Sequence, residues 1–248
     1  MTLQRFFEEN PTVALAFSGG VDSAYLLYAA KACGAQIHVY YAKTPFQPRF
    51  EYDDALRLAR QLEIPMTTVE LDVLADPAIA ANPHNRCYFC KQKIFTAILE
   101  AAEKDGFSLV IDGTNASDDA TDRPGMQALK ELQVRSPLRE CGLTKAKIRR
   151  LSKEAGLFTH DRPAYACLAT RIPTGTPITT DLLARTERSE ELLKRLGFLD
   201  FRIRLVEDSA KIQLTEDQLP LLLHHREAIL QELKQDYSTV LLDLEVRQ

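Results

Sequence analysis

The chain has 248 residues, of which 45% are hydrophobic and 27% charged, so it can bury a core without disulfide or metal staples. Its net charge of −4 disfavours a partner made mostly of phosphate backbone. No apolar run approaches the roughly 18 residues that a membrane helix needs, and no secretory signal is evident. Five cysteines, an odd number, fit a reducing compartment. We therefore expect a cytoplasmic globular protein that contacts neither membrane nor nucleic acid.

Strand and helix patterns alternate over the first two thirds of the chain. Short apolar runs predict strands at residues 12–17, 37–42, 66–71, 108–111 and 134–136. Helical spacing predicts helices at residues 22–33, 50–62, 91–104, 127–133 and 144–155. Residues 75–90, rich in Asp, Asn, Pro and Cys, are interpreted as an irregular connection. This alternation predicts an α/β fold, a doubly wound parallel sheet with helices on both faces.

The pattern changes near residue 160. Residues 161–178 are rich in Pro and Gly and predict a loop. Beyond it we expect a smaller α+β unit with helices at 179–196 and 219–234 and strands at 201–206, 211–214 and 239–244. The first two of these strands read as a hairpin. The sequence therefore predicts two domains, over residues 1–160 and 161–248.

A glycine-rich turn follows the first predicted strand and opens the next helix; it reads SGGVDS, residues 18–23. At such a turn, backbone N–H groups and the helix dipole face any bound anion. Asp22 cannot bind phosphate directly, so we assign it to a magnesium ion that bridges phosphates. The segment lacks the lysine and spacing of a Walker loop. A plain strand-to-helix turn is the alternative.

This turn resembles the PP-loop of ATP pyrophosphatases, which cleave ATP between the α and β phosphates and adenylate a substrate before a nitrogen or sulfur nucleophile attacks. The segment DGTNASD at 112–118 resembles the second nucleotide loop of that superfamily, and SPL at 136–138 with LTK at 143–145 resembles its usual ending. The resemblance covers roughly residues 11–156. It implies an ATP site made by Ser18, Gly19, Gly20, Asp22, Ser23, Gly113, Thr114, Asn115 and Asp118.

Three further segments resemble the LarE family, ATP-dependent sulfur transferases that build the nickel-pincer cofactor of lactate racemase. They are NRCYFCK at 85–91, RPG at 123–125 and ACLATRIP at 166–173. That family adenylates a carboxylate of pyridinium-3,5-biscarboxylic acid mononucleotide and replaces the activated oxygen with sulfur, twice in all. The resemblance implies a small-molecule nucleotide substrate, a homo-oligomer, and Cys167 at the position of the sulfur-carrying cysteine.

The sulfur source has several interpretations. In the best-known version of the family, the cysteine gives up its own sulfur and becomes dehydroalanine. Here Cys87 and Cys90 form a C-x-x-C pair that could converge with Cys167 on a 4Fe–4S cluster whose open iron carries sulfide. We favour the cluster because it can be recharged. Zinc with His84 or His160, or two small core cysteines, are the alternatives.

Other residues are candidates for substrate contacts. Lys91 is expected at a helix start, where the dipole disfavours a cation, so a catalytic role competes with a solvated lysine. Arg123 and Arg171 are predicted to hold a phosphate or carboxylate of the substrate. Arg202 and Arg204 share one strand face, which is either substrate-binding or an exposed charged face. Acidic residues 187, 190 and 191 are expected to form a solvated helix face.

Three other functions compete with sulfur transfer to a small molecule. A tRNA thiolase of the same superfamily is disfavoured by the acidic pI and by the lack of a Lys/Arg-rich segment. An ammonia-using synthetase leaves the cysteines at 87, 90 and 167 unexplained. A non-enzymatic nucleotide sensor is disfavoured by the intact segment 18–23.

Overall fold

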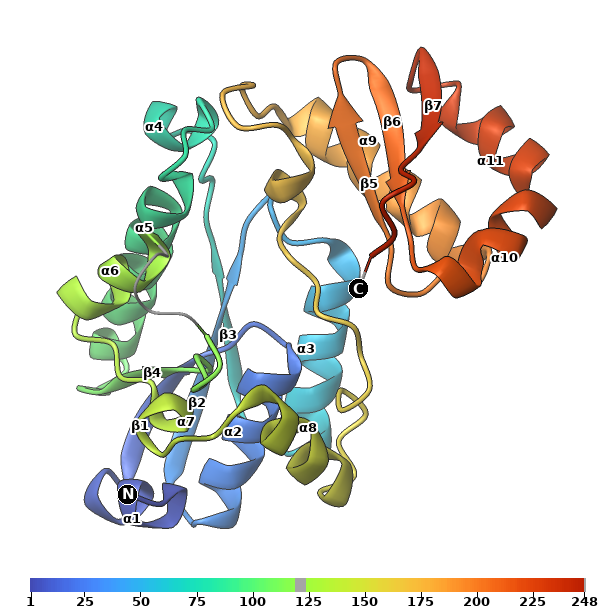
Figure 1. Cartoon of the computed structure of the whole chain (residues 1–248). Helices are drawn as coiled ribbons and strands as arrows, with labels where there is room; N and C mark the ends of the chain where they lie inside the picture. The colour runs from blue at the N-terminus through green and yellow to red at the C-terminus, as the bar shows by residue number, and fades with distance from the viewer. Residues whose placement is uncertain (119–123, 248) are drawn as a thin grey trace. The chain divides into compact units, whose positions relative to one another are not determined.

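The computed structural model describes residues 1–118 and 124–247, and the chain divides into two compact units (Figure 1). The first unit comprises Met1–Val73 and Asn85–Arg162. The second comprises Leu74–His84 and the chain from Pro163 onward. The segment Leu74–His84, which the sequence analysis assigned to the first domain, therefore groups with the C-terminal residues.

In the described residues, the first unit contains a four-stranded sheet with the order β3-β2-β1-β4. Its strands are β1 (Thr12–Ala16), β2 (Gln36–Lys43), β3 (Met66–Glu70) and β4 (Val110–Asp112). All three strand pairings are parallel, which confirms the predicted parallel α/β sheet. The fifth strand predicted at 134–136 is wrong, because Arg135 forms a single isolated bridge with Ile111.

Alternation along β1 gives the sheet two buried faces. Val13 and Leu15 belong to one core cluster, whereas Ala14 and Ala16 belong to another, as expected when successive side chains point to opposite faces. The first cluster takes in residues of α1 (Leu3–Glu9), α2 (Val21–Ala32), α3 (Arg49–Gln61) and α8 (Lys145–Glu154). The second takes in residues of α5 (Arg86–Lys104) and α6 (Pro124–Glu131). Helices thus cover both faces, as predicted.

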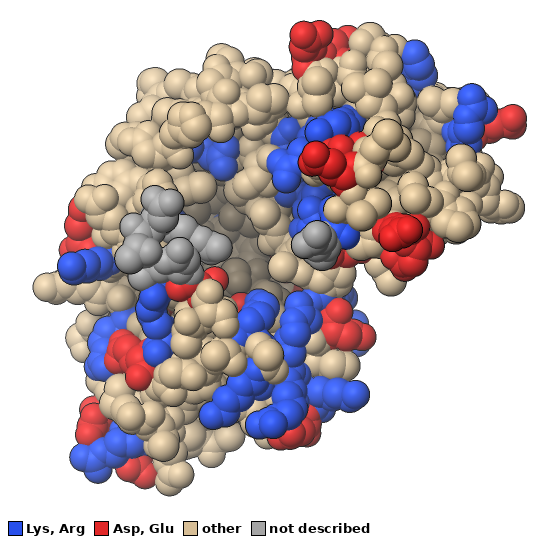
Figure 2. All heavy atoms as spheres, in the orientation of Figure 1, with Lys and Arg blue, Asp and Glu red and all other residues tan. Residues whose placement is uncertain are grey.

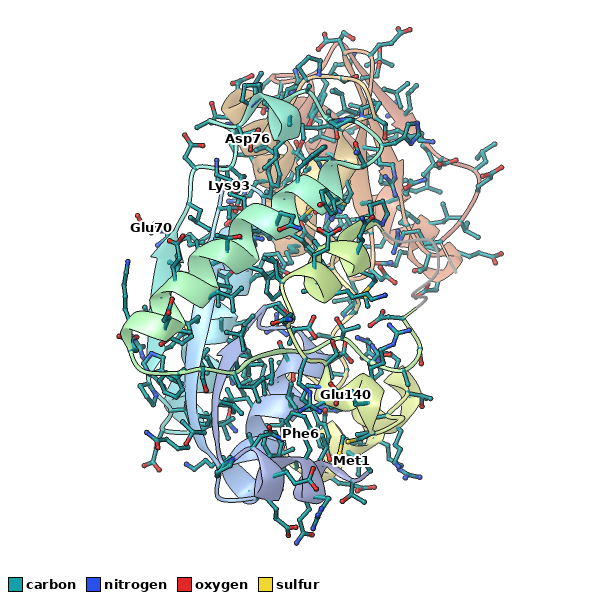
Figure 3. All side chains as sticks on the ribbon, turned by 90° about the vertical axis from the view of Figure 1, so that its left-hand side faces the viewer. Met1, Phe6, Glu70, Asp76, Lys93 and Glu140 are labelled. Atoms are coloured by element: carbon teal, nitrogen blue, oxygen red, sulfur yellow. The ribbon has the colours of Figure 1, made fainter. Side chains whose placement is uncertain are left out.

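Three short α-helices were not predicted by the sequence patterns. They are α1, α4 (Pro77–Ala80) and α7 (Pro137–Glu140), and α5 begins at Arg86 rather than at residue 91. The Asp76 carboxylate caps α4 by accepting from the Ala78 N–H at 2.9 Å. Phe6 of α1 lies close to Glu140 of α7 (Figure 3), and the Arg135 guanidinium links them, 4.6 Å from the Phe6 ring centre and paired with Glu140.

The second unit contains a three-stranded sheet, β5-β6-β7, in its described residues. β5 (Arg202–Val206) and β6 (Ser209–Gln213) form the predicted antiparallel hairpin, and β7 (Thr239–Leu242) pairs parallel with β6. The remaining elements are a 3-10 helix η1 (Leu168–Arg171), α9 (Thr180–Arg195), a 3-10 helix η2 (Glu216–Gln218), α10 (Leu219–His224) and α11 (Arg226–Leu233). The single helix predicted at 219–234 is therefore interrupted. No helix in the described chain has the length and apolar character to cross a membrane.

Candidate functional site

The glycine-rich turn joins β1 to α2, with Gly20 as the N-cap. The Ser18 and Ser23 hydroxyls lie 3.1 Å apart, and Ser23 Oγ also donates to the Gly20 carbonyl at 3.1 Å. Gly19 has a φ of 75°, and a Cβ there would lie 3.1 Å from the Glu51 carbonyl oxygen, so only glycine fits comfortably. In the described part of the chain no side chain caps α2. The first-turn N–H groups therefore remain available to an anion.

Asp22 lies in the first turn of α2, with its two carboxylate oxygens in different environments. Lys145 Nζ donates to Oδ2 at 2.5 Å, whereas Oδ1 is buried and has no hydrogen-bond partner among the described residues. Burial raises the pKa of the Asp22 carboxyl above its ordinary 3.8, and the Lys145 ammonium opposes that rise. A buried carboxylate oxygen without a donor fits a hard cation such as magnesium.

The second nucleotide loop begins where β4 ends at Asp112. The Asp112 carboxylate accepts from the Thr114 hydroxyl at 2.5 Å and from the Ser136 hydroxyl at 2.6 Å. Further along, Asn115 Oδ1 accepts from the Ser117 N–H at 2.7 Å. The loop is thus shaped largely by its own side chains, in the manner of Asx turns.

The two loops meet at Gly113. A Cβ there would lie 2.8 Å from the Ser23 backbone nitrogen and 2.9 Å from the Ser23 Cα. The structure therefore brings together the two predicted nucleotide segments, 18–23 and 112–118, at the carboxyl ends of adjacent parallel strands, where open α/β sheets bind ligands. Asp118, whose carboxylate accepts from the Asn115 N–H at 3.0 Å, closes the second loop.

Lys145 belongs to this site, although the sequence analysis quoted it only within the LTK segment at 143–145 and gave it no role. Its N–H donates to Ser117 Oγ at 3.0 Å, and its ammonium binds Asp22, so it connects α8 to both loops. The N-cap Thr144 before it, accepting from the Lys147 N–H, marks the start of α8 in the sequence. The sequence signal that could have pointed to Lys145 was this helix cap, followed directly by a lysine in the first turn.

Helix α8 is also strongly basic. Figure 2 shows Lys and Arg side chains gathered where α8 lies in Figure 1. The helix carries five basic residues in ten: Lys145, Lys147, Arg149, Arg150 and Lys153. The expectation that the chain lacks a Lys/Arg-rich segment is therefore wrong, and the overall net charge concealed it.

Cys87 and Cys90 lie at the beginning of α5. Three residues apart, they share one side of the helix; Cys87 is exposed and Cys90 half-buried. A helix N-terminus favours thiolates.

Because α5 begins at Arg86, Lys91 lies in its second turn, and the dipole argument for its role is wrong. A Cβ on Gly125 would lie 2.8 Å from Lys91 Cδ, so this side chain packs across α6. Its catalytic role stays a prediction.

In the second unit, Cys167 is half-buried and precedes η1. Arg171, at the end of η1, is 1% exposed, and its guanidinium binds Glu190 at 2.7 Å. Glu190 is only 4% exposed, so the expectation of a solvated face is wrong there: its partner is a buried arginine. Arg202 is 6% exposed, so an exposed charged face is also wrong for it. Substrate binding by Arg171, Arg202 and Arg204 stays a prediction.

The remaining predicted ligands and contacts are distributed as follows. Arg123 lies outside the described residues. Cys87 and Cys90 belong to the first unit and Cys167 to the second. Within residues 1–118 and 124–247, no group of three or more His, Cys, Asp and Glu side chains is arranged to hold a metal ion. The cluster therefore stays a prediction that involves both units.

A parallel sheet whose first strand leads into a glycine-rich turn at a helix N-terminus is an arrangement with which α/β proteins bind anionic ligands such as nucleotides. Comparison with known proteins narrows this class. A pyridinium-3,5-bisthiocarboxylic acid mononucleotide synthase of Lactiplantibacillus plantarum is 31% identical over 220 residues, 88% of this chain and 80% of that protein. The chain belongs to the family of that synthase.

Other relatives agree with this assignment. An uncharacterised protein of Synechocystis sp. is 38% identical over 218 residues, 88% of this chain and 81% of its own length. A tRNA-specific 2-thiouridylase of Clostridium botulinum is 28% identical over 183 residues, and the match spans 52% of that enzyme. No family model matches the chain. Homology to a bisthiocarboxylic acid synthase and to thiouridylases supports a sulfur-transfer enzyme.

Proposed function

We propose that this chain is an ATP-dependent sulfur transferase that converts carboxylates of pyridinium-3,5-biscarboxylic acid mononucleotide to thiocarboxylates, forming AMP and pyrophosphate. The observation that carries the nucleotide half is the half-buried Asp22 carboxylate, with one oxygen on Lys145 and the other, a buried oxygen, without a hydrogen-bond donor among the described residues. The similarity to the bisthiocarboxylic acid synthase supports the sulfur half and the substrate.

The first step is adenylation. A substrate carboxylate oxygen attacks the α phosphorus of ATP, and pyrophosphate leaves with the electrons of the broken P–O bond. The N–H groups at the start of α2 and the hydroxyls of Ser18 and Ser23 face the phosphates. A magnesium ion on Asp22 would neutralise charge on the departing pyrophosphate. The basic residues of α8 favour an anionic ligand in the first unit.

The second step is sulfur transfer. A sulfur nucleophile attacks the acyl carbon of the adenylate, and AMP leaves with the former carboxylate oxygen. We propose Cys87, Cys90 and Cys167 as ligands of a 4Fe–4S cluster, which when bound would supply the sulfide. Two of these thiols share one side of the start of α5, a donor set that fits iron or another thiophilic metal. Transfer from Cys167 itself is the alternative.

The nucleotide half is tested by product analysis. With ATP and the dicarboxylate nucleotide, we expect AMP and pyrophosphate. Release of ADP and orthophosphate instead would overturn the PP-loop assignment. Thiolation of tRNA without thiolation of the dicarboxylate would favour the thiouridylase-like alternative, which the basic helix α8 keeps open.

The sulfur half is tested with cysteine variants of anaerobically purified protein. Cys87→Ala, Cys90→Ala and Cys167→Ala should each lose sulfur transfer and the absorption and EPR signals of the cluster, while adenylation survives. Cys33→Ala, at an exposed position after α2, is the matched control. After turnover with sulfide, mass spectrometry should find Cys167 intact. Dehydroalanine at 167 with active Cys87 and Cys90 variants would establish the sacrificial mechanism instead.

A further inference from the structure

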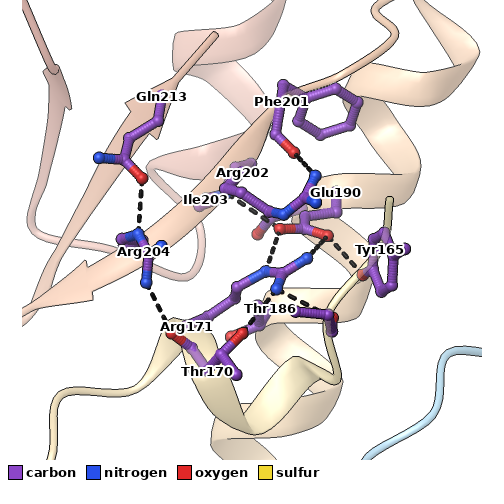
Figure 4. A network of polar contacts seen from close by, with 12 residues as sticks. Tyr165, Thr170, Arg171, Thr186, Glu190, Phe201, Arg202, Ile203, Arg204 and Gln213 are labelled. Carbon is purple, nitrogen blue, oxygen red and sulfur yellow. Dashed lines mark hydrogen bonds and ion pairs between the residues drawn. The ribbon is translucent and has the colours of Figure 1, made fainter. Parts of the chain in front are cut away.

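Three arginines of the second unit donate hydrogen bonds to backbone carbonyls of residues 164–170, the segment that contains Cys167. Figure 4 shows these three arginines, with Arg204 bound to Thr170. Arg202 donates to the Ala164 carbonyl, and Arg171 Nη1 donates to the Ala166 carbonyl at 3.0 Å. On the other side of the cysteine, Arg204 Nη1 donates to the Thr170 carbonyl at 2.7 Å. The backbone is therefore held on both sides of Cys167 by side chains from η1 and β5.

Glu190 of α9 is the centre of this arrangement. Its Oε1 accepts from Arg171 Nε at 2.7 Å and from the Ile203 N–H at 3.0 Å. Its Oε2 accepts from Arg171 Nη2 at 3.1 Å and from the Tyr165 hydroxyl at 2.5 Å. One carboxylate thus connects α9, β5, η1 and the segment before Cys167, with four donors on two oxygens.

Such an arrangement is an expensive way to pack a loop. Removing a carboxylate and a guanidinium from water costs several kcal/mol per ion, and a well-packed apolar pair is often as stable. Arginines in the cluster also repel one another: burial, together with Arg171 and Arg247, lowers the pKa of Arg202 to about 10. The benefit of this geometry is a fixed orientation, because the two parallel hydrogen bonds between a planar guanidinium and a carboxylate orient both side chains.

We propose that the Arg171–Glu190 pair, together with Arg202 and Arg204, is a positioning device that fixes the backbone on both sides of Cys167 and so the direction of its thiol. Glu190 acts through Arg171 and Tyr165 rather than on a substrate. This proposal rests on the proposed function, because it takes Cys167 to be a residue of sulfur transfer. The geometry itself can be tested without that reaction.

The structural test compares Glu190→Gln with Glu191→Gln, an exposed neighbour on the same helix. Glu190→Gln removes the charge that holds the Arg171 fork. Because hydrogen bonds to charged groups contribute about 1.5–3 kcal/mol, hydrogen exchange of residues 163–173 should rise about 10- to 100-fold. Alkylation of Cys167 by iodoacetamide, followed by peptide mass spectrometry, should change in rate as well. Glu191→Gln should match the wild type in both.

Arg171→Lys separates position from charge. Lysine keeps a positive charge but cannot form the two-pronged contact, so we expect the same effects as for Glu190→Gln. If Arg171→Lys behaves like the wild type, charge alone suffices and the proposal is wrong. If Glu190→Gln fails to fold, Tyr165→Phe decides: it removes one hydroxyl contact and should give a smaller rise, about threefold to tenfold, in exchange of 163–173.

Activity provides the second measurement. Single-turnover sulfur transfer by Glu190→Gln should fall at least about tenfold, while the KM for ATP in adenylation stays unchanged, because the nucleotide loops belong to the first unit. Equal losses in both steps would indicate general destabilisation and overturn the proposal, as would unchanged exchange and alkylation. If the wild type transfers no sulfur, the proposed function fails, but exchange and alkylation still decide the positioning role.

Discussion

The nucleotide loops of the first unit and the Cys167 segment of the second differ in how far apart along the chain their hydrogen-bonded residues lie. Hydrogen bonds within segments 18–23 and 112–118 span two to five residues. Three bonds that hold residues 164–170 instead span 25 to 38 residues. The nucleotide loops therefore combine their local bonds with three contacts from Ser136 and Lys145, 24 to 123 residues away. The cysteine segment combines local bonds with support from a distant helix and strand.

Because of this difference, we expect variants of the two regions to impair different steps of the proposed reaction. In the proposed function the backbone N–H groups of these loops and Asp22 bind the phosphates, so a change in the loops should alter ATP cleavage first. A change in the arginine network should alter sulfur transfer first. The two kinds of variant therefore test whether the division of labour between the units is real.

The largest expected effect comes from Asp22→Asn. The variant keeps the shape of the side chain but loses the charge that would hold magnesium. Metal stabilisation of a phosphoryl transition state contributes several kcal/mol, so pyrophosphate release should fall by about 10³-fold or more. Pyrophosphate release measured with and without added Mg²⁺ checks this. Residual activity near the wild-type level would remove Asp22 from the nucleotide site.

The same Asp22→Asn variant, which should lose activity, should gain stability. Because burial raises the pKa of Asp22 above 3.8, its ionised form weakens the folded state at pH values above that raised pKa. Asp22→Asn should therefore raise the thermal midpoint near pH 7. This gain should shrink as the pH falls through the raised pKa of Asp22 and vanish below its ordinary 3.8, where the carboxyl is protonated in both the folded and the unfolded chain. A lower midpoint at neutral pH would show that the Lys145 contact outweighs the burial.

The sequence predicted the first unit better than the second for the same physical reason. The short apolar run at 12–17 and the turn at 18–23 are local signals, and the structure places both as predicted. The burial of Glu190 and Arg202 is not local, because a charged side chain is buried only when a distant partner compensates it. The early start of α5 was missed since Asp, Asn, Pro and Cys in 75–90 suggested a loop.

A smaller effect is expected at the contact between the two nucleotide loops. Gly113→Ala would place a Cβ 2.8 Å from the Ser23 nitrogen, which is backbone and cannot simply move aside. Overpacking of this kind costs about 1–3 kcal/mol and should shift the start of α2. We expect the KM for ATP to rise about tenfold, measured by steady-state pyrophosphate release.

Gly34→Ala is the matched control, because Gly34 follows the opposite end of α2. Its φ is 75° and nothing lies within 4 Å of the added Cβ, so the cost is strain alone, about 1–2 kcal/mol. Stability should fall by a similar amount in both variants, whereas only Gly113→Ala should alter ATP kinetics. An equal change in KM would mean that stability, not loop contact, governs the site.

The smallest expected effects compare the helix caps of the two units. Thr144 Oγ1 accepts from the Lys147 N–H at 3.4 Å to cap α8, and Thr179 Oγ1 accepts from the Leu182 N–H at 3.2 Å to cap α9. Thr→Ala at either position should lower the free energy of unfolding by about 1 kcal/mol, measured by urea denaturation, with Thr→Ser as the control that retains the cap.

Thr144→Ala should also raise the KM for ATP slightly, since the capped turn carries Lys145, which holds Asp22. Thr179→Ala should leave that KM unchanged, because α9 supports the arginine network instead. If the two caps altered ATP kinetics equally, the nucleotide site would depend on both units, and the division between local loops and distant supports would be wrong.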